Sequence, residues 1–441
     1  MLVSFSVKNF LSFKEKTTFT MVGTSERQHS DRVPAVKKFR MKILPIAAIY
    51  GGNASGKSNF VKALAFVQNF VVQGLAPDLS IARSTFRLDE AMASEPTEFE
   101  FSLLIEDRLY EYSFAVDSRT VLSEKLQEVN TSSNKVLFQR NGSDIQLVSF
   151  KKNEILEFVA QGTRENILFL TNSVWQKIEV FKPVYDWFRS RLQIITPVSR
   201  FVPVDELLNE SNPLSKSMSK MLRRLDTGID HLEGQLIDLD MVLHDEKEKE
   251  SLLSMIQEDQ SVTYRQKSQI YVITKQKGSL IAKRLAASHV NSNGQRILFG
   301  LHEESDGNNR LINLIPAFFQ LTNARSEDVF IFDELDRSLH PLLTRTLIEN
   351  FLSVCESQSR AQMIFTTHDI SLMDQDVFRR DELWVTERNR EGETRLYSFS
   401  DYEGLRKDKN IRKAYMEGRL GGLPNILGCC VVNGSWTSAY E

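Results

Sequence analysis

Residues 51–58 read Gly51-Gly52-Asn53-Ala54-Ser55-Gly56-Lys57-Ser58, and they directly follow the apolar run Ile43–Tyr50. This order predicts a buried strand, a glycine-bearing loop and the first turn of a helix, which is the arrangement that cradles a triphosphate. Backbone N–H groups and the positive end of the helix dipole favour anionic phosphates. We expect Lys57 to reach the β- and γ-phosphates and the Ser58 hydroxyl to help hold Mg²⁺. The alternative is a strand–turn–helix corner that uses glycine only for tightness.

A second apolar run, Val329–Phe332, ends in the adjacent carboxylates Asp333 and Glu334. Two carboxylates at the end of a buried strand are costly unless they meet a cation or water. Asp333 therefore fits the Mg²⁺ partner of Ser58, and Glu334 fits the residue that orients and deprotonates an attacking water. A solvated Asp-Glu turn is the alternative, which the phosphate loop upstream disfavours.

The bulk composition sets limits on the class of protein. The chain has 441 residues, with 55 Lys and Arg against 58 Asp and Glu, a formal net charge of −3 and three cysteines. Its length suggests two or three domains, and its near-neutral balance argues against wholesale nucleic-acid binding by charge. Cys355, Cys429 and Cys430 have no metal-ligand spacing and form no disulfide framework. No stretch resembles a membrane span or a signal peptide, so we expect a soluble, cytoplasmic protein without a membrane partner.

The first part of the chain, residues 1–150, predicts a lobe that combines the phosphate loop with a β subdomain. Leu2–Phe5 and Val7–Phe13 read as a first strand or hairpin, and Lys57–Val72 has helical spacing of apolar residues. The remaining expected strands are Thr97–Ile105, Tyr110–Val116, Lys135–Arg140 and Ile145–Phe150.

Residues 151–290 predict a mainly helical insertion, and residues 291–441 predict a second lobe of the same head. The expected helices of the insertion are Phe169–Leu192, Ser215–Leu239 and Asp245–Gln257. In the second lobe, Ile297–Leu301 is expected to return the chain to the core. The elements expected after it are a helix at Leu311–Leu321 and strands at Val329–Phe332 and Gln362–Thr366.

Three further segments carry polar residues at element ends. Ser305 and Gly307 precede the helical pattern Leu311–Leu321 and would form a second anion site, although Ser-Asp-Gly is also a common turn and helix cap. Leu335–Pro341 directly follows the two carboxylates. His368 closely follows the strand Gln362–Thr366, where a γ-phosphate contact is sensible because strand C-termini face the ligand in open α/β sheets. An ordinary strand-end histidine is the alternative.

In order and spacing these motifs resemble those of ABC-type ATPases of the SMC/RecF-like group. More narrowly, the chain resembles compact AAA-type ATPases of bacterial anti-phage systems, such as Septu PtuA and PARIS AriA, and relatives of the OLD-type ATPases. The resemblance covers nearly the whole chain and implies an α/β P-loop ATPase head, with a mixed sheet and an antiparallel β subdomain, split by the insertion. Its segments are Asn9–Phe13, Gly51–Ser58, Leu225–Ile229, Glu304–Gly307, Asp333-Glu334, Ser338–Pro341, Thr367–Asp369, Arg379–Asp381 and Gly418–Pro424.

The resemblance also implies roles for single residues. Ser305 and Gly307 match the signature motif that caps the γ-phosphate on the opposite subunit, and His368 matches the switch histidine. Lys57, Glu334 and His368 are then the catalytic residues, and Ser58 and Asp333 the metal ligands. The implied ATP-binding residues are Asn9, Ser12, Gly51, Gly52, Asn53, Ala54, Ser55, Gly56, Lys57, Ser58, Asn59, Ser305, Gly307, Asp336 and Ser338. The usual Q-loop glutamine has two candidates, Gln127 and Gln139.

The resemblance favours an ATPase, with ATP and Mg²⁺ as cofactors, that dimerises head to tail and controls an effector nuclease or toxin in anti-phage defence. The second hypothesis is an SMC/RecF-like repair or tethering protein, in which basic segments such as Arg223-Arg224 and Lys283-Arg284 contact DNA phosphates. A nuclease site at Asp238 and Asp240 is a third hypothesis, but no acidic partner stands near them in the pattern. A transporter ATPase is disfavoured because the signature and the large insertion depart from that class.

Overall fold

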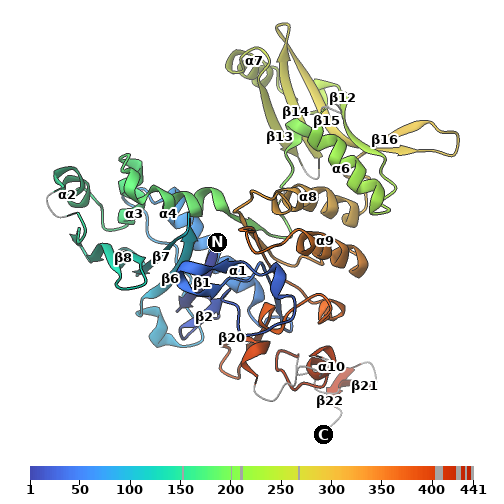
Figure 1. Cartoon of the computed structure of the whole chain (residues 1–441). Coiled ribbons are helices and arrows are strands. Elements are labelled where there is room, and N and C mark those ends of the chain that lie inside the picture. Colours follow the sequence, from blue (N-terminus) through green and yellow to red (C-terminus); the bar gives the residue numbers. More distant parts are fainter. Residues whose placement is uncertain are drawn as a thin grey trace. The chain divides into compact units, whose positions relative to one another are not determined.

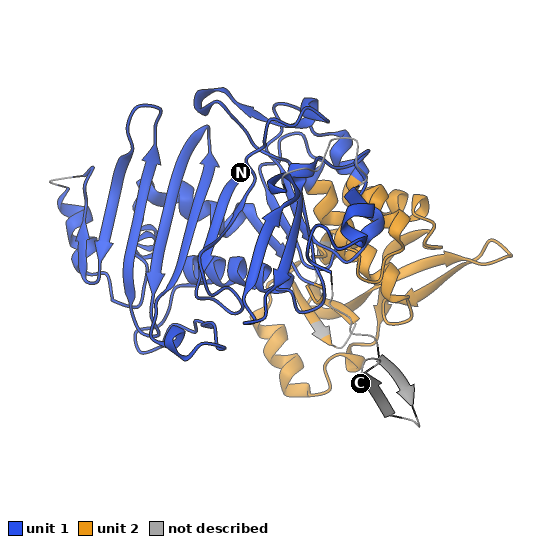
Figure 2. Cartoon of the chain, turned by 90° about the horizontal axis from the view of Figure 1, so that it is seen from below, with its two compact units in different colours: residues 1–196, 321–335, 349–441 blue, residues 197–320, 336–348 orange. Residues whose placement is uncertain are grey.

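The computed structural model describes residues 1–150, 153–199, 201–208, 212–266, 269–402 and 411–423, together with the backbone of strands β21 (Cys429–Val432) and β22 (Ser435–Ser438). Figure 1 shows the course of the chain. Contacts divide it into two compact units (Figure 2). Unit 1 comprises Met1–Thr196, Leu321–Leu335 and Glu349–Glu441, and unit 2 comprises Pro197–Gln320 and Asp336–Ile348. The predicted division near residues 150 and 290 follows the sequence alone and stays a prediction.

One sheet of unit 1 is antiparallel throughout and includes the first strand of the chain. Its alternating runs put apolar side chains on the face that packs into the core and polar ones on the other. In spatial order its strands are β10 (Asp144–Gln146), β9 (Lys135–Asn141), β8 (Val121–Val129), β7 (Arg108–Val116), β6 (Thr97–Ile105), β1 (Leu2–Lys8) and β2 (Thr17–Thr20). The short pair β3 (Ala35–Val36) and β4 (Met41–Lys42) lies apart from it.

The other sheet of unit 1 is parallel except at its last strand, and it carries the site residues at its strand ends. Its strands, in spatial order, are β11 (Leu192–Ile195), β17 (Val329–Phe332), β18 (Gln362–Thr366), β5 (Ile46–Tyr50), β19 (Leu383–Arg388) and β20 (Thr394–Ser398). Every residue of β5, β17 and β18 is buried, as expected for a sheet covered on both faces. The mixed α/β fold class predicted from the sequence is confirmed.

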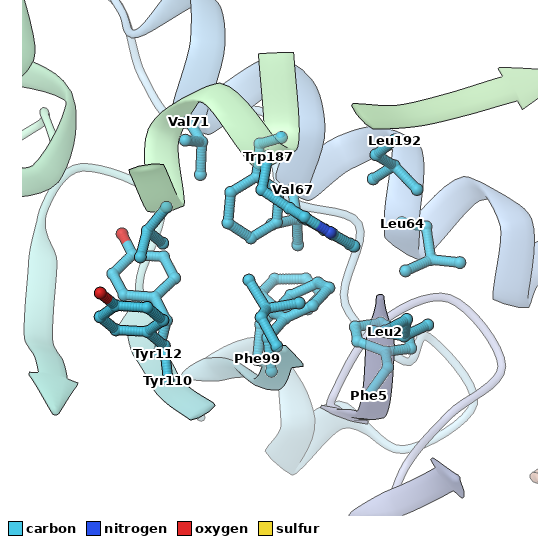
Figure 3. Packing of buried hydrophobic residues seen from close by; sticks show 14 of the residues in the cluster. Leu2, Phe5, Leu64, Val67, Val71, Phe99, Tyr110, Tyr112, Trp187 and Leu192 are labelled. Atoms are coloured by element: carbon cyan, nitrogen blue, oxygen red, sulfur yellow. The ribbon is translucent and has the colours of Figure 1, made fainter. Parts of the chain in front are cut away.

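Helix α1 (Lys57–Gln73) forms the centre of the core of unit 1. Its buried side chains recur at helical spacing, and the Phe60 ring lies 5.7 Å from Phe5 and 5.1 Å from Phe19, measured between ring centroids. Figure 3 shows Leu64 and Val67 of the same helix among the buried residues of this cluster. Each buried aromatic or aliphatic side chain contributes about 1.5–3 kcal/mol to folding. This burial fixes the helix whose first turn carries Lys57 and Ser58.

The remaining helices of unit 1 are short. They are α2 (Glu154–Gln161), α3 (Phe169–Trp175), α4 (Lys182–Asp186) and α10 (Ile411–Met416). The predicted helix Phe169–Leu192 is therefore broken: α3, α4 and a π-helical turn at Trp187–Arg191 share this segment, which ends in β11. Pro183 sits in the first turn of α4, a position where proline is tolerated.

Unit 2 combines helices with an antiparallel sheet. Its helices are α5 (Val204–Leu207), α6 (Pro213–Arg224), α7 (Glu246–Met255) and, shared with unit 1, α8 (Asp306–Leu321) and α9 (Pro341–Ser353). Its strands are β12 (His231–Ile237), β13 (Ser261–Gln266), β14 (Gln269–Gln276), β15 (Ser279–Val290) and β16 (Arg296–Gly300).

The insertion was expected to be mainly helical, and its second half contains the strands β12, β13, β14 and β15 as well as α7. The predicted helix Ser215–Leu239 ends at Arg224, because Asp226 and Gly228 adopt left-handed backbone conformations with φ of 54° and 76°. The chain then forms β12 instead of continuing the helix. The segment Ile297–Leu301 is a strand as predicted, but β16 pairs with β15 of unit 2 and does not return the chain to the core sheet.

Most other predicted elements are confirmed, namely α1, α7, α8, β1, β5, β6, β7, β9, β17 and β18, with ends shifted by a few residues. Strand β8 was not predicted, because its inward face carries the buried carboxylate Glu124. That carboxylate accepts hydrogen bonds from the backbone N–H groups of Phe169 and Leu170, at 2.6 and 3.0 Å. Within the described residues, no helix is both long and apolar enough to cross a membrane.

Candidate functional site

The phosphate loop joins β5 to α1 through backbone conformations that few residues adopt. Gly51 has a φ of 149° and Gly56 a φ of 111°, values in the region that favours glycine. A Cβ atom on Gly56 would lie 2.8 Å from Cβ of Thr394, so side-chain bulk is excluded there as well. The shape of the loop therefore explains the glycines at both ends of Gly-x-x-x-x-Gly. The turn places the first residues of α1, Lys57 and Ser58, beside the cavity.

Lys57 is the first residue of α1 and is only 6% exposed. Its ammonium group donates hydrogen bonds to the carbonyl oxygens of Gly51 and Gly52, at 2.8 and 3.0 Å. These bonds hold the amine against the loop, where a buried positive charge is stabilised by carbonyl dipoles. A triphosphate in the loop would meet this charge directly.

Ser58 and Asp333 are brought together, as the sequence predicted. The Ser58 hydroxyl donates to Asp333 Oδ1 at 3.1 Å, although the residues come from α1 and from the end of β17. Asp333 is 7% exposed. A hydroxyl and a carboxylate oxygen at this separation are the hard oxygen ligands that Mg²⁺ takes from protein in nucleotide sites, so the donor set fits the ion.

Thr366, the last residue of β18, contacts Asp333 and Glu334, and the sequence interpretation did not include it. Its hydroxyl donates to Asp333 Oδ1 at 2.8 Å and accepts a hydrogen bond from the backbone N–H of Glu334, also at 2.8 Å. The available signal was its position two residues before His368, but a threonine in a strand is ordinary and gave no reason to single it out.

A cavity of about 1130 Å³ lies at the phosphate loop. The catalytic candidates Lys57, Glu334 and His368 all line it. The predicted ATP-binding residues that line it are Ser12, Asn53, Ala54, Ser55, Gly56, Lys57, Ser58 and Asn59. The volume is large enough for a nucleotide, since ligand pockets are commonly about 300–1,000 Å³.

Ser12 and Asn59 hold one edge of this cavity. The Asn59 amide donates to Ser12 Oγ at 2.7 Å, and the Thr394 hydroxyl lies 2.7 Å from the same oxygen. The Thr394 hydroxyl also contacts the carbonyl oxygen of Ser55 at 2.8 Å. The N-terminal segment and strand β20 are thereby fastened to the phosphate loop.

Another wall of the cavity comes from the loop between α1 and β6, which no sequence pattern had indicated as part of the site. Its lining residues are Arg83, Ser84, Thr85, Phe86, Arg87, Leu88, Asp89, Glu90 and Ala93, with Leu11, Arg388 and Gly392 from other segments. Lys14 forms an ion pair with Asp89 at 2.8 Å, and its ammonium holds the pKa of that carboxyl below its usual range. The loop thus adds basic and acidic groups to the cavity.

Asn9 does not line the cavity, and its predicted contact with nucleotide stays a prediction; the structure shows it in a supporting position. The side chain is fully buried, and its amide donates to the carbonyl oxygens of Met92 and Glu95 at 2.8 and 2.9 Å. Its own carbonyl accepts from the N–H of Phe86 at 3.0 Å. Asn9 therefore holds the loop that forms the wall of the cavity.

Gly52, whose contact with nucleotide stays a prediction, also makes a backbone contact that supports the loop. Its N–H donates to the carbonyl oxygen of Gly422 at 2.8 Å, and so is directed at the protein's own backbone. The Tyr415 hydroxyl donates to the same oxygen at 3.1 Å, and burial raises the pKa of Tyr415 to about 12, which keeps the hydroxyl protonated. The Gly418–Leu423 part of the motif near the C-terminus thus supports the phosphate loop, and Pro424 lies outside the described residues.

The predicted second anion site belongs to unit 2. Ser305 caps helix α8, accepting a hydrogen bond from the N–H of Asn308 at 3.1 Å, and its side chain is exposed. A Cβ atom on Gly307 would lie 2.9 Å from the carbonyl oxygen of Ser338, which brings the two predicted motifs together within this unit. Asp336 belongs to the same unit. Neither Gln127 nor Gln139 lines the cavity of unit 1 as described.

Glu304 connects this helix end to the sheet of unit 2. Its side chain, 5% exposed, accepts from the amide of Asn308 at 2.7 Å and lies 2.6 Å from Nε2 of His289 on β15. The Asn308 amide also donates to the carbonyl oxygen of Thr227 at 3.1 Å. The turn at Leu225–Ile229, which belongs to the resemblance, therefore contacts the signature segment.

Residues 46–374 match a protein-family model described as "AAA domain, putative AbiEii toxin, Type IV TA system". The chain belongs to this family. The match includes the phosphate loop, Asp333-Glu334 and His368, so the assignment to P-loop ATPases is confirmed at the level of the AAA family. Among solved structures, the SMC head domain from Thermotoga maritima is similar at 14% sequence identity and a TM-score of 0.34, with 90% of this chain and 98% of that chain covered. No curated protein matches the chain.

Proposed function

We propose that this AAA-family chain hydrolyses ATP in the cavity at its phosphate loop. The observation that carries the proposal is the 3.1 Å contact between Ser58 and Asp333, two residues that meet because α1 begins and β17 ends at the same edge of the sheet. Lys57, Glu334 and His368 line the same cavity. A strand–turn–helix corner without a ligand would need none of these groups.

The residues divide the chemistry among them. Lys57 and the backbone N–H groups at the start of α1 bind the β- and γ-phosphates. Ser58 and Asp333 would hold Mg²⁺, which supplies charge neutralisation on the phosphate oxygens. Glu334 orients the attacking water and accepts its proton, and His368 donates to the γ-phosphate oxygens.

The proposed active state is a head-to-tail dimer of heads. Ser305 and Gly307 stand at the N-terminus of α8, a 16-residue helix whose dipole favours an anion. In the dimer they would cap the γ-phosphate bound by a second copy, so ATP favours closure and hydrolysis releases it. The exposure of Ser305 supports this proposal, because a capping residue must be accessible to the partner.

The proposed biological role is a sensor or regulatory subunit of an anti-phage defence complex that controls a nuclease or toxin. Support comes from the family description, which names a toxin and a type IV toxin–antitoxin system. The nuclease hypothesis on Asp238 and Asp240 receives no support: Asp240 pairs with Lys249, Asp238 caps a short helix, and no group of three metal-binding side chains occurs among the described residues.

The role is tested by expressing the chain with the reading frame adjacent to its gene, if that frame encodes a nuclease or toxin. We expect the two proteins to co-purify and the effector's toxicity to depend on Lys57 and Glu334. Equal toxicity with the wild-type chain, with Lys57→Ala and with no chain at all would contradict the regulatory role.

A second candidate function, DNA binding, is favoured by one observation. Helix α6 exposes Lys216, Lys220, Arg223 and Arg224 on one side and contains no acidic residue. Arg223 pairs with Asp230 at 3.1 Å, which leaves three cations for phosphate contacts. Anisotropy titrations with duplex DNA test it: binding should weaken steeply with salt and in a triple Lys216→Glu, Lys220→Glu, Arg224→Glu variant. Binding whose affinity changes neither with salt nor in the triple variant would contradict a role for α6.

A further inference from the structure

Thr366 occupies a position where a hydroxyl group has two defined tasks. The residue is 1% exposed and ends β18, between β17 and β5 in the sheet. A backbone N–H can only donate, so the Thr366 oxygen accepts from Glu334, and its single hydrogen goes to Asp333 Oδ1. One side chain is thus bonded to both predicted catalytic-site carboxylate residues.

The bond to Asp333 bears on the cation position. Ser58 and Thr366 donate to the same oxygen, Asp333 Oδ1, at 3.1 and 2.8 Å. A cation that takes Ser58 and Asp333 as ligands displaces the contact between them. Thr366 is not one of these ligands, so its hydroxyl can keep donating to Asp333 Oδ1 and hold the orientation of the carboxylate with and without the cation.

The bond to Glu334 bears on the water-activating group. Glu334 has a φ of 48°, in the left-handed region that a non-glycine residue rarely adopts. Such a conformation persists only where the surroundings impose it. The Thr366 hydroxyl accepts from the Glu334 N–H, and the Thr366 carbonyl accepts from the next N–H, that of Leu335, at 3.1 Å. These two bonds hold the bend that turns the Glu334 side chain into the cavity.

We propose that Thr366 is a positioning residue that couples the cation ligand Asp333 to the base Glu334. The inference rests on the proposed ATPase function and deepens it, because it names the side chain that sets the geometry of both groups. A threonine that merely filled its place in a buried strand would be replaceable by valine, which has the same shape. A coupling residue needs the hydroxyl, which serine retains.

The experiment compares Thr366→Val and Thr366→Ser with the wild-type full chain. Thr344→Val is the matched control, because Thr344 is fully buried on α9 and its hydroxyl has no hydrogen-bond partner in the described part of the chain. Four quantities are measured: the melting temperature, ATP affinity in EDTA, Mn²⁺ affinity of the nucleotide complex by electron paramagnetic resonance, and kcat as a function of Mg²⁺ concentration.

We expect Thr366→Val to weaken Mn²⁺ binding and lower kcat by about 10- to 100-fold, the effect of losing an outer-shell partner of a metal ligand. Its ATP affinity in EDTA should stay within about twofold of wild type, since Lys57 and the loop are untouched. Thr366→Ser should restore Mn²⁺ affinity and kcat to within about threefold. Thr344→Val should match wild type in all four measurements.

The inference is overturned if Thr366→Val keeps wild-type Mn²⁺ affinity and kcat, or if Thr366→Ser is as impaired as Thr366→Val. It is also overturned if Thr366→Val loses ATP affinity in EDTA and melting temperature together, since the role would then be structural. In each of these cases the wild-type chain still binds and hydrolyses ATP. A wild-type chain that binds no ATP would instead refute the proposed function, and the inference with it.

Discussion

Ser58 Oγ lies 3.1 Å from Asp333 Oδ1, although 275 positions separate the two residues in the chain. The contact joins the helix after the phosphate loop to the end of a neighbouring strand, and each element is fixed by its own burial. Asp333 is held further by Thr366. The pair therefore marks the point where a divalent cation and the phosphates of a nucleotide would meet.

Replacing Lys57 by alanine should abolish measurable nucleotide binding. The variant removes the charge that meets the phosphates and also the two bonds that the ammonium makes to the loop carbonyls. We expect a loss of about 100-fold or more in ATP affinity, or at least ~3 kcal/mol, measured by calorimetric titration. Lys62→Ala, an exposed position on the same helix, is the control and should bind as wild type. Comparable affinity in the two variants would argue against the cavity as the nucleotide site.

Replacing Glu334 by glutamine should separate binding from hydrolysis. The amide keeps the size of the side chain but cannot accept the proton of water, so we expect turnover to fall about 10²–10⁴-fold while ATP still binds. If the closed dimer waits for hydrolysis, this variant should accumulate as a dimer in ATP, as measured by light scattering. Glu391→Gln, at an exposed turn, serves as control. A monomeric Glu334→Gln protein in saturating ATP would count against closure by ATP.

Asn9→Ala should act on stability first. The substitution removes one acceptor and several donor contacts that tie the loop around Phe86 and Met92 to the N-terminal strand. We expect the free energy of unfolding in urea to fall by about 2–4 kcal/mol, because each buried partner loses its hydrogen bond. Asn69→Ala, at an exposed position of α1, should change it by less than ~0.5 kcal/mol. Equal effects of the two substitutions would refute the supporting role of Asn9.

Glu382 should make stability depend on pH near neutrality. Burial raises the pKa of this carboxyl from 4.5 to about 7, even though Arg32 lies 2.6 Å away. The folded protein then holds the proton more tightly than the unfolded chain, so this group's contribution to stability falls as the pH rises from 4.5 to about 7. Urea unfolding of wild type and Glu382→Gln from pH 5 to 8 should show a difference that changes by about 1–3 kcal/mol. Parallel curves over this range would show that Glu382 is ionised throughout.

The sequence predicted the parts of the site that have fixed local patterns. The phosphate loop, the strand before Asp333 and the strand before His368 each carry a signal in consecutive residues, and the structure places all three at one sheet edge. Asn9 is predicted to contact nucleotide because its segment resembles one near the ligand, but the bonds of its buried amide to a loop more than 70 residues away were not predicted. Such long-range hydrogen bonds leave no trace in local composition.

The missed elements have a common physical cause. Strand β8 carries a charge on its inward face, and β12 begins within a run whose apolar spacing also suits a helix. In both cases a contact with a distant segment determines the strand. Backbone N–H groups stabilise the buried Glu124 carboxylate of β8, and β12 pairs with β15. Thr366 was missed for the same reason, since its hydroxyl bonds to two residues that directly follow the neighbouring strand β17.

The central claim, that two copies complete each other's nucleotide site, is tested most directly by mixing two inactive variants. Lys57→Ala lacks the phosphate lysine, and Ser305→Arg blocks the cap at the exposed end of α8. Each alone should be inactive, whereas an equimolar mixture should recover roughly a quarter of the wild-type ATPase rate, because random pairing gives half of the dimers one intact site out of two. A mixture no more active than its separate components, or full activity of Ser305→Arg alone, would contradict the shared site.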